Sequence, residues 1–373
     1  MARKQKRVFI LGGGAALGAH HVGALKCLDE QGIKPDVIVG SSIGVINACC
    51  YASGGVPQLE QAWSEFRSLP RIFSPSLVHN PLFGRSLFSM DRLSSSIEEY
   101  IDFPKIFESR LELEFILLNL SRGRGEVYSK KECRDWRELR TISRAGYAIP
   151  FLFPPVEFRG DTFVDGGFAW NIPLEHALGL GATEIYLLAP IASQLPYRAR
   201  FRTFFGFVQR FIDVMWRTIG NMGYLYARMD QGRFHGVPVT LIEPGEQYSG
   251  FGPLHVFNAY PRKNRALMEA GYRDAKRVIA ARRRLEEQER AQRPERKASD
   301  RRPPRRSRQA AETARDVRPV IAVEGGAVVP ATGGPKLAAP STGRAASAPE
   351  AVGTSADVSG KVVALRAEPR DDS

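Results

Sequence analysis

A serine in the surroundings of an activated nucleophile lies early in the chain. The segment Gly40–Gly44 reads G-S-S-I-G and fits G-x-S-x-G, with Ser42 at its centre. An apolar stretch, Asp36–Gly40, precedes Ser42, and a helical pattern, Ile43–Ala52, follows it. This order predicts a tight strand-to-helix turn that exposes Ser42 at a helix N-terminus, where the helix dipole favours negative charge. The spacing also fits an ordinary turn in which Ser42 caps the helix.

A glycine-rich segment follows the first apolar stretch, Arg7–Leu11. Gly12–Gly18 reads G-G-G-A-A-L-G and leads into a helical pattern. Such a loop points backbone N–H groups at an anion without obstruction by side chains, as an oxyanion hole or a phosphate loop requires. The glycines miss the G-x-G-x-x-G spacing of a dinucleotide site, and no Gly-Lys-Ser/Thr follows. We therefore prefer the oxyanion loop.

A carboxylate on a glycine turn lies far downstream. Asp165, Gly166 and Gly167 follow the apolar pair Phe163-Val164. A carboxylate at a strand end can take the proton of Ser42 if burial or a neighbour sets its pKa. The same three residues also fit an ordinary Asp-Gly turn.

The histidines offer a different arrangement. A Ser-Asp-His triad would place its histidine after the acid, and both His235 and His255 lie in loop-like surroundings. Metal binding is not expected, because the adjacent pair His20 and His21 points to different faces of a helix and no other group has ligand spacing.

The elements that position these residues read β-α-β-α at the start of the chain. This pattern predicts a parallel sheet whose loops gather at the carboxyl ends of the strands. Later strands are expected at Leu111–Leu120, Glu184–Ala189 and Val237–Glu243, and a long helix at Arg262–Glu289.

Composition sets the broad class. The 373 residues are 43% hydrophobic and 25% charged, which suits one large domain or two ordinary ones. No apolar run approaches the roughly 20 residues of a membrane span, and no signal peptide is expected. The four cysteines suit reduced thiols, so we expect a cytoplasmic protein. Peripheral attachment to a membrane is compatible with that location.

The net charge of +13 separates a working domain from an appendage. Residues 290–373 carry a net charge of +6, are rich in Ala, Pro, Arg, Gly and Ser, and contain no aromatic residue. We expect a folded domain over residues 1–289 and a disordered basic tail over 290–373. The tail would attract polyanions, but it lacks aromatics for base stacking, so a nucleic acid partner is not expected.

The glycine loop, the G-x-S-x-G motif and Asp-Gly-Gly occur in an order that resembles the patatin-like phospholipase family. The resemblance covers roughly residues 5–290 and includes Gly18–Leu25, like the family's first helix, and Ile149–Pro155, like the approach to its aspartate. It implies a three-layer α/β/α fold with a mostly parallel central sheet. It also implies a lipid acyl ester as substrate and no cofactor.

The resemblance further implies a Ser-Asp dyad without histidine. Ser42 would attack the ester carbonyl, Asp165 would act as general base, and the amides of Gly13, Gly14 and Ala15 would hold the oxyanion. Phospholipase A, lysophospholipase and acyltransferase chemistry would share this acyl-enzyme.

Two positions depart from the family pattern, which has a third glycine and then a basic residue before the final glycine of the loop. This chain has Ala15 and Leu17 there. Ala15 disfavours a positive φ, and Leu17 removes a positive charge near the oxyanion, so we expect lower activity or a different substrate. Two rivals remain: an α/β-hydrolase esterase with a Ser-Asp-His triad, which the early position of the G-x-S-x-G motif disfavours, and a catalytically weak lipid-binding or scaffold protein.

A segment suited to a lipid surface completes the prediction. Phe201–Arg228 interleaves aromatic residues with arginines, as the headgroup boundary of an anionic membrane favours. An ordinary helix that packs its aromatics into the core would show much the same pattern. Leu82–Met90 is a second, weaker candidate for a mobile cap.

Overall fold

A computed structural model describes residues 5–66, 86, 88–193, 200, 203–219, 229, 232–245 and 260–292. The predicted tail from residue 293 onward, His255 and most of the predicted cap segment lie outside these ranges. Within them, no helix has the length and apolar character that crossing a bilayer requires.

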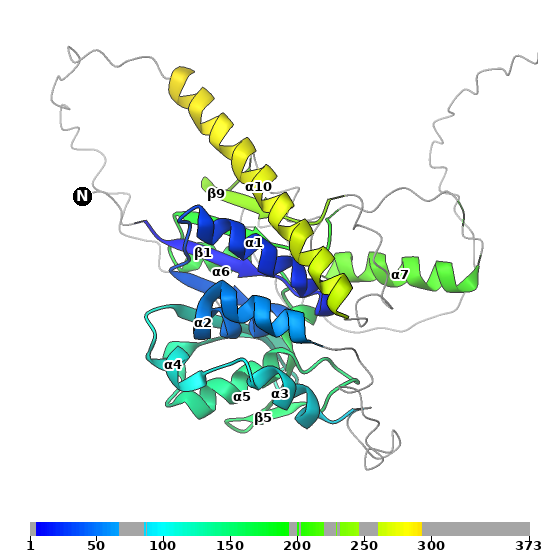
Figure 1. Cartoon of the computed structure of the whole chain (residues 1–373). Coiled ribbons are helices and arrows are strands. Elements are labelled where there is room, and N and C mark those ends of the chain that lie inside the picture. Colours follow the sequence, from blue (N-terminus) through cyan, green and yellow to red (C-terminus); the bar gives the residue numbers. More distant parts are fainter. Residues whose placement is uncertain are drawn as a thin grey trace, which may run out of the picture. The chain divides into compact units, whose positions relative to one another are not determined.

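A mostly parallel sheet forms the centre of the fold (Figure 1), as predicted. Neighbouring parallel strands run in the order β3 (Glu112–Asn119), β2 (Val37–Gly40), β1 (Arg7–Leu11), β7 (Glu184–Leu188) and β9 (Val237–Ile242). The antiparallel strand β8 (Arg233–Phe234) pairs with β9, and β4 (Arg124–Ser129) pairs with β3. Parallel alignment gathers the loops after β1, β2 and β7 at one edge of the sheet.

Two strands meet end to end beside β3. β2 pairs with β3 from Glu112 to Phe115, whereas β6 (Asp161–Asp165) runs the opposite way and pairs with Leu117–Asn119. Because β4 pairs with both stretches along the other edge of β3, β2 and β6 must share one edge. Their ends face each other across the level of Ile116. β5 (Val156–Phe158) pairs with the outer side of β6.

Helices cover both faces of the sheet and complete three layers. One face carries α1 (Ala19–Glu30), α2 (Ile43–Glu65), α4 (Phe103–Glu108), α5 (Trp136–Gly146) and α10 (Pro261–Gln292), and the other carries α6 (Leu174–Gly179). The remaining helices of the described part of the chain are α3 (Met90–Glu98), α7 (Phe204–Ile219) and the short 3₁₀ turns η1 (Ala15–Gly18), η2 (Lys130–Glu132) and η3 (Gly166–Phe168). α2 extends the predicted helix Ile43–Ala52 to Glu65 across a kink at Gly54 and Gly55.

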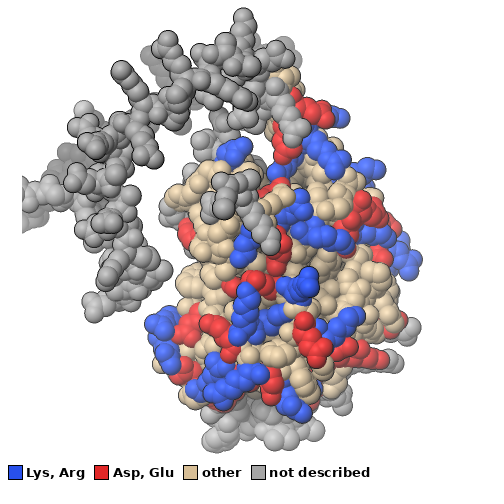
Figure 2. Space-filling view, turned by 90° about the vertical axis from the view of Figure 1, so that its left-hand side faces the viewer, with Lys and Arg blue, Asp and Glu red and all other residues tan. Residues whose placement is uncertain are grey.

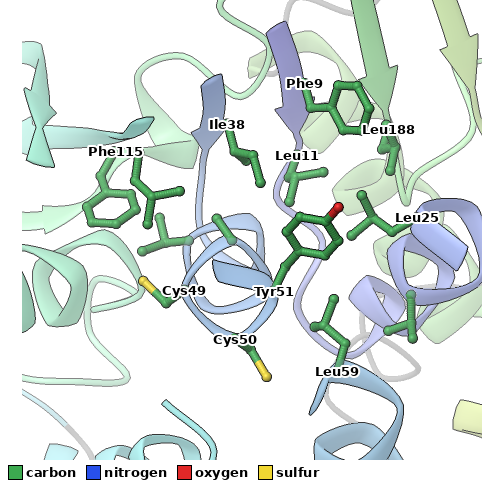
Figure 3. Packing of buried hydrophobic residues seen from close by; sticks show 14 of the residues in the cluster. Phe9, Leu11, Leu25, Ile38, Cys49, Cys50, Tyr51, Leu59, Phe115 and Leu188 are labelled. Carbon is green, nitrogen blue, oxygen red and sulfur yellow. The ribbon is translucent and has the colours of Figure 1, made fainter. Parts of the chain in front are cut away.

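Successive side chains of a strand point to opposite faces of the sheet, and each face has its own hydrophobic core. Phe9 and Leu11 pack toward α1 and α2, whereas Val8 and Ile10 pack toward α6. Figure 3 shows the first core, in which Tyr51 of α2 lies among side chains of β1, β7 and α1. Buried apolar side chains on both faces of the central strands are what a sheet with two helical layers requires.

Two glycines allow α1 and α10 to pack closely. A Cβ at Gly23 would lie 1.7 Å from the carbonyl oxygen of Met268, and one at Gly271 would lie 2.0 Å from that of His20. The end of the chain's described part is thereby fixed against the helix that follows the glycine loop.

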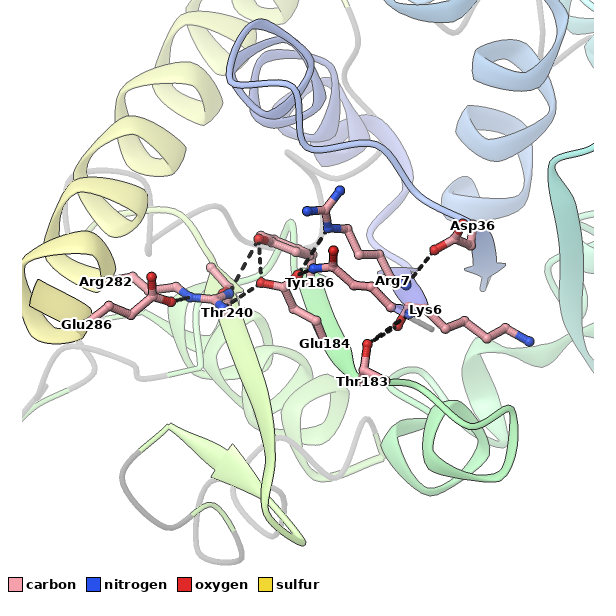
Figure 4. Close-up of polar contacts among 10 residues, drawn as sticks. Lys6, Arg7, Asp36, Thr183, Glu184, Tyr186, Thr240, Arg282 and Glu286 are labelled. Atoms are coloured by element: carbon pink, nitrogen blue, oxygen red, sulfur yellow. Dashed lines mark hydrogen bonds and ion pairs between the residues drawn. The ribbon is translucent and has the colours of Figure 1, made fainter. Parts of the chain in front are cut away.

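A second set of contacts fixes α10 at the amino ends of the strands (Figure 4). Arg282 pairs with Glu184 at 2.5 Å, and Glu184 also pairs with Arg7 of β1. Figure 2 shows basic and acidic side chains intermixed on this side of the molecule.

The close helix contact gives a testable expectation. Gly23→Ala places a methyl group inside the backbone of α10, so we expect it to lower the free energy of unfolding by at least about 2 kcal/mol. Gly179→Ala is the control, because a Cβ there meets no atom within 4 Å. Urea unfolding followed by circular dichroism measures both, and equal midpoints would contradict the packing described.

Candidate active site

Ser42 lies at a sharp turn between β2 and α2, as the motif predicts. Its backbone has φ 54° and ψ −125°, a strained conformation for a residue with a side chain. Its side chain is half-buried. Strain of this kind persists where the surrounding structure imposes it, and here it projects the hydroxyl at the carboxyl edge of the sheet.

The glycines of the motif allow this turn to pack against β1. A Cβ at Gly44 would lie 1.9 Å from the carbonyl oxygen of Leu11, and one at Gly40 would lie 2.9 Å from the backbone of Gly44. The Ser41 N–H donates to the same Leu11 oxygen at 3.1 Å. The G-x-S-x-G spacing is therefore a requirement for close backbone approach.

Asp165 lies beside Ser42. Its side chain is buried, and its carboxylate accepts hydrogen bonds from the Ser42 hydroxyl and, at 2.8 Å, from the Gly167 N–H. Burial raises the pKa of the Asp165 carboxyl to about 7, although both hydrogen bonds act in the opposite direction. Near neutral pH, this group can either hold or release a proton.

The turn after Asp165 crosses close to β3. A Cβ at Gly166 would lie 2.1 Å from the carbonyl oxygen of Ile116, and one at Gly167 would lie 3.4 Å from the Ser41 hydroxyl oxygen. Glycine at these two positions lets η3 pass between the end of β6 and the turn that carries Ser42. The Asp-Gly-Gly sequence is thus part of the site's geometry rather than a hairpin turn.

The glycine loop passes next to Ser42. A Cβ at Gly13 would lie 2.9 Å from the Ser42 Cβ. The Gly13 N–H, one of the three predicted oxyanion donors, donates to the Asn171 side-chain oxygen at 2.5 Å. The N–H groups of Gly14 and Ala15 have no hydrogen-bond partner among the described residues. Asn171 is a site residue that the sequence analysis did not single out.

The two departures from the family pattern have different consequences. Ala15 adopts φ 46°, so the loop does use a positive φ at the position where the family has glycine. Leu17 is 3% exposed and packs in the core against α1 and α2. The Leu17 side chain therefore points into the core, away from the space in which we expected a lost positive charge to matter.

The described histidines lie away from Ser42 or serve other contacts. His235 lies in the turn before β9, at the amino edge of the sheet, roughly 20 Å along the strand from the edge that carries Ser42. His176 pairs with Glu114, and His20 pairs with Asp274 at 3.1 Å. The triad hypothesis that relied on His235 is wrong, because the two residues are on opposite edges of the sheet.

His21 belongs to a buried hydrogen-bond network that holds the glycine loop. Its Nε2 donates to the Leu188 carbonyl at 3.1 Å, and its Nδ1 accepts from Asn47 at 3.1 Å, an assignment that leaves the ring neutral. Burial lowers the pKa of His21 to about 3. Asn47 also donates to the Gly18 carbonyl, and the Gly12 N–H donates to Leu188. Both ends of the loop are therefore held by one buried network.

Comparison with known proteins agrees with this arrangement. Residues 9–178 match the family model described as patatin-like phospholipase. The matched residues are thus similar to a patatin-like phospholipase domain. The matched range includes the glycine loop, the Ser42 turn and Asp165, and it ends within α6.

Curated relatives of the patatin-like domain are much longer proteins. "Lysophospholipase nte1" of Aspergillus fumigatus is 31% identical over 188 residues, which cover 48% of this chain and 11% of that protein. "Patatin-like phospholipase domain-containing protein 6" of Mus musculus is 28% identical over 182 residues, which cover 47% of this chain and 13% of that protein. The chain thus spans about a tenth of the length of these relatives.

Solved structures with some likeness include VipD from Legionella pneumophila, with a TM-score of 0.45 at 12% identity. The alignment covers 75% of this chain and 67% of VipD. The type III effector ExoU aligns with a TM-score of 0.37 at 14% identity, over 75% of this chain and 53% of ExoU.

The positive φ at Ala15 leads to a prediction. Ala15→Gly removes the steric cost of the left-handed conformation, of order 1–2 kcal/mol, but adds the entropy of an unfolded glycine. We expect a net gain in the free energy of unfolding of up to about 1 kcal/mol.

Ala16→Gly is the matched control, because Ala16 is buried in the same turn without a positive φ. It should lower the free energy of unfolding by about 0.5–1 kcal/mol. Chemical denaturation measures both variants. Equal destabilisation by the two substitutions would contradict the strain at Ala15.

Proposed function

We propose that the chain is a serine lipid acyl hydrolase of the phospholipase A or lysophospholipase type, which acts through a Ser42–Asp165 dyad and an acyl-enzyme. The observation that carries the proposal is the buried Asp165 carboxylate, hydrogen-bonded to the strained Ser42 and with a pKa of about 7. A base with a pKa near the working pH is best placed for proton transfer.

The reaction follows from these positions. Asp165 accepts the hydroxyl proton while Ser42 Oγ bonds to the ester carbonyl carbon. The carbonyl electron pair moves onto the oxygen, which the N–H groups of Gly14 and Ala15 stabilise. Collapse of this intermediate expels the alcohol, which takes the proton from Asp165. Water then attacks the acyl carbon while Asp165 accepts its proton, and the second tetrahedral intermediate breaks its bond to Ser42 Oγ. Asp165 returns the proton to Ser42 Oγ, and the fatty acid leaves.

An apolar cluster next to Asp165 supports a lipid acyl group as substrate. The Asp165 N–H donates to the Ala148 carbonyl, and the segment around Ala148 packs with α3 and with Ile46 of α2. Phe151 of the same segment is 82% exposed and has φ 68°. Phe151 therefore offers exposed apolar surface in the segment that contacts Asp165. The names of the curated relatives make lysophospholipids the first substrates to test.

We also propose peripheral contact with an anionic membrane surface through α7. Its exposed apolar side chains are 41–83% accessible and recur at helical spacing: Phe204, Phe207, Phe211, Val214 and Met215. Arg210 lies on the flank of this stripe by helical spacing. The chain reaches α7 from the carboxyl end of β7, where Pro190 and Ile191 contact Gly14. Apolar and basic side chains on one helix suit the headgroup boundary.

Labelling with a fluorophosphonate tests the dyad. We expect wild-type protein to label at Ser42, and Ser42→Ala not to label. Asp165→Asn should label at least about 10²-fold more slowly, because the general base is lost. The wild-type rate should rise with pH and level off above about pH 7, since only the ionised Asp165 can accept the proton. His176→Ala is the control and should label like wild type.

An unlabelled wild type would overturn the serine mechanism and favour a lipid-binding or scaffold role. Labelling that is unchanged in Asp165→Asn would remove Asp165 from the mechanism.

Vesicle flotation tests membrane contact. In the Ser42→Ala background, we expect binding to vesicles of phosphatidylcholine with phosphatidylglycerol and weaker binding to phosphatidylcholine alone. Phe207→Ser with Phe211→Ser should lower binding at least about tenfold, because two exposed apolar side chains are lost. Leu285→Ser on α10, also an exposed apolar residue, is the control. Equal binding by all three proteins would contradict the role of α7.

A further inference from the structure

Asn171 links the acid's loop to the glycine loop. It lies six residues after Asp165 and is 8% exposed. Its Oδ1 accepts the Gly13 N–H at 2.5 Å, although the two residues are 158 positions apart in the chain. The segment that contains Asp165 therefore also holds the glycine loop, in which the N–H groups of Gly14 and Ala15 have no partner among the described residues.

Three parts of the site converge at Gly13. A Cβ at that position would lie 2.7 Å from Asn171 Oδ1 and 2.9 Å from the Ser42 Cβ. The Asn171 carboxamide and the Ser42 Cβ therefore both lie close to the same side of the Gly13 Cα.

The hydrogen bond also determines which amides remain available. A donated N–H fixes the plane of its peptide group, and the plane between Gly12 and Gly13 is fixed in this way by Asn171. The next two N–H groups, of Gly14 and Ala15, have no partner among the described residues. The Nδ2 of Asn171 likewise donates to no described residue and is not sealed from solvent.

We propose that Asn171 is a positioning residue for the oxyanion loop. By accepting the Gly13 N–H, it removes this donor from the oxyanion site and directs the amides of Gly14 and Ala15 toward the carbonyl that Ser42 attacks. This role rests on the proposed function. Donors contribute to the rate only when they are aligned with the developing charge, so loss of the Asn171 acceptor should act on the transition state.

The test compares hydrolysis of a soluble short-chain nitrophenyl ester with that of its thionoester, in which sulfur replaces the carbonyl oxygen. Sulfur is larger and accepts hydrogen bonds poorly, so an aligned oxyanion site favours the oxygen ester. Asn171→Leu keeps the volume of the side chain and removes the acceptor. We expect kcat for the oxygen ester to fall about 10²-fold with KM unchanged, and the preference for the oxygen ester to shrink.

Asn171→Ala provides a second variant if the leucine does not fold, with the same expected result. Asn264→Ala is the matched control: Asn264 is fully buried and donates to the Trp63 carbonyl at 3.0 Å, away from Ser42. It should lose stability, yet keep the wild-type preference between the two esters.

The outcomes separate this proposal from the function it rests on. If wild type hydrolyses the ester and labels at Ser42, but the Asn171 variants keep kcat within about threefold or keep the full preference for the oxygen ester, the positioning role is wrong. If wild type neither hydrolyses nor labels, the dyad mechanism is wrong and the role of Asn171 falls with it.

Discussion

The shared edge of β3 is the constraint on which the site depends. β2 arrives along one half of this edge and β6 along the other half from the opposite direction, so their ends meet at Ile116. Ser42 follows one end and Asp165 lies at the other. The junction has room for backbone only, since a Cβ at Gly166 would lie 2.1 Å from the Ile116 oxygen. A serine and a carboxylate more than 120 residues apart in sequence are brought together by strand pairing.

Burial at this junction gives the carboxylate its chemistry. An aspartate in water has a pKa near 4 and is a weak base. Enclosure between β3 and the Ser42 turn removes solvent from Asp165 and raises its pKa to about 7, while hydrogen bonds from Ser42 and Gly167 keep the group oriented. The same packing disfavours the ionised form of Asp165. The folded protein therefore loses stability as the pH rises from about 4, the pKa in the unfolded chain, to about 7, the pKa in the folded protein. We regard this cost as part of how the proposed dyad works without histidine.

The sequence predicted much of this arrangement because its signals are local. A glycine motif between an apolar stretch and a helical pattern defined the Ser42 turn, and the β-α-β-α start predicted the parallel sheet. The antiparallel entry of β6 was not predictable, because it depends on pairing with β3, over 40 residues earlier. The Asn171 contact with Gly13 was missed for the same reason. At Ala15 the residue type alone gave the wrong expectation. Alanine disfavours a positive φ, yet the packing of the loop imposes one.

The most direct measurement is the titration of the Asp165 carboxyl itself. Infrared difference spectra of wild type against Asp165→Asn, recorded across pH 3 to 9, isolate the protonated carboxyl band of that residue. We expect a band that disappears with a midpoint near pH 7. A midpoint near pH 4, as in a solvated aspartate, would contradict the central claim that burial beside Ser42 creates the base.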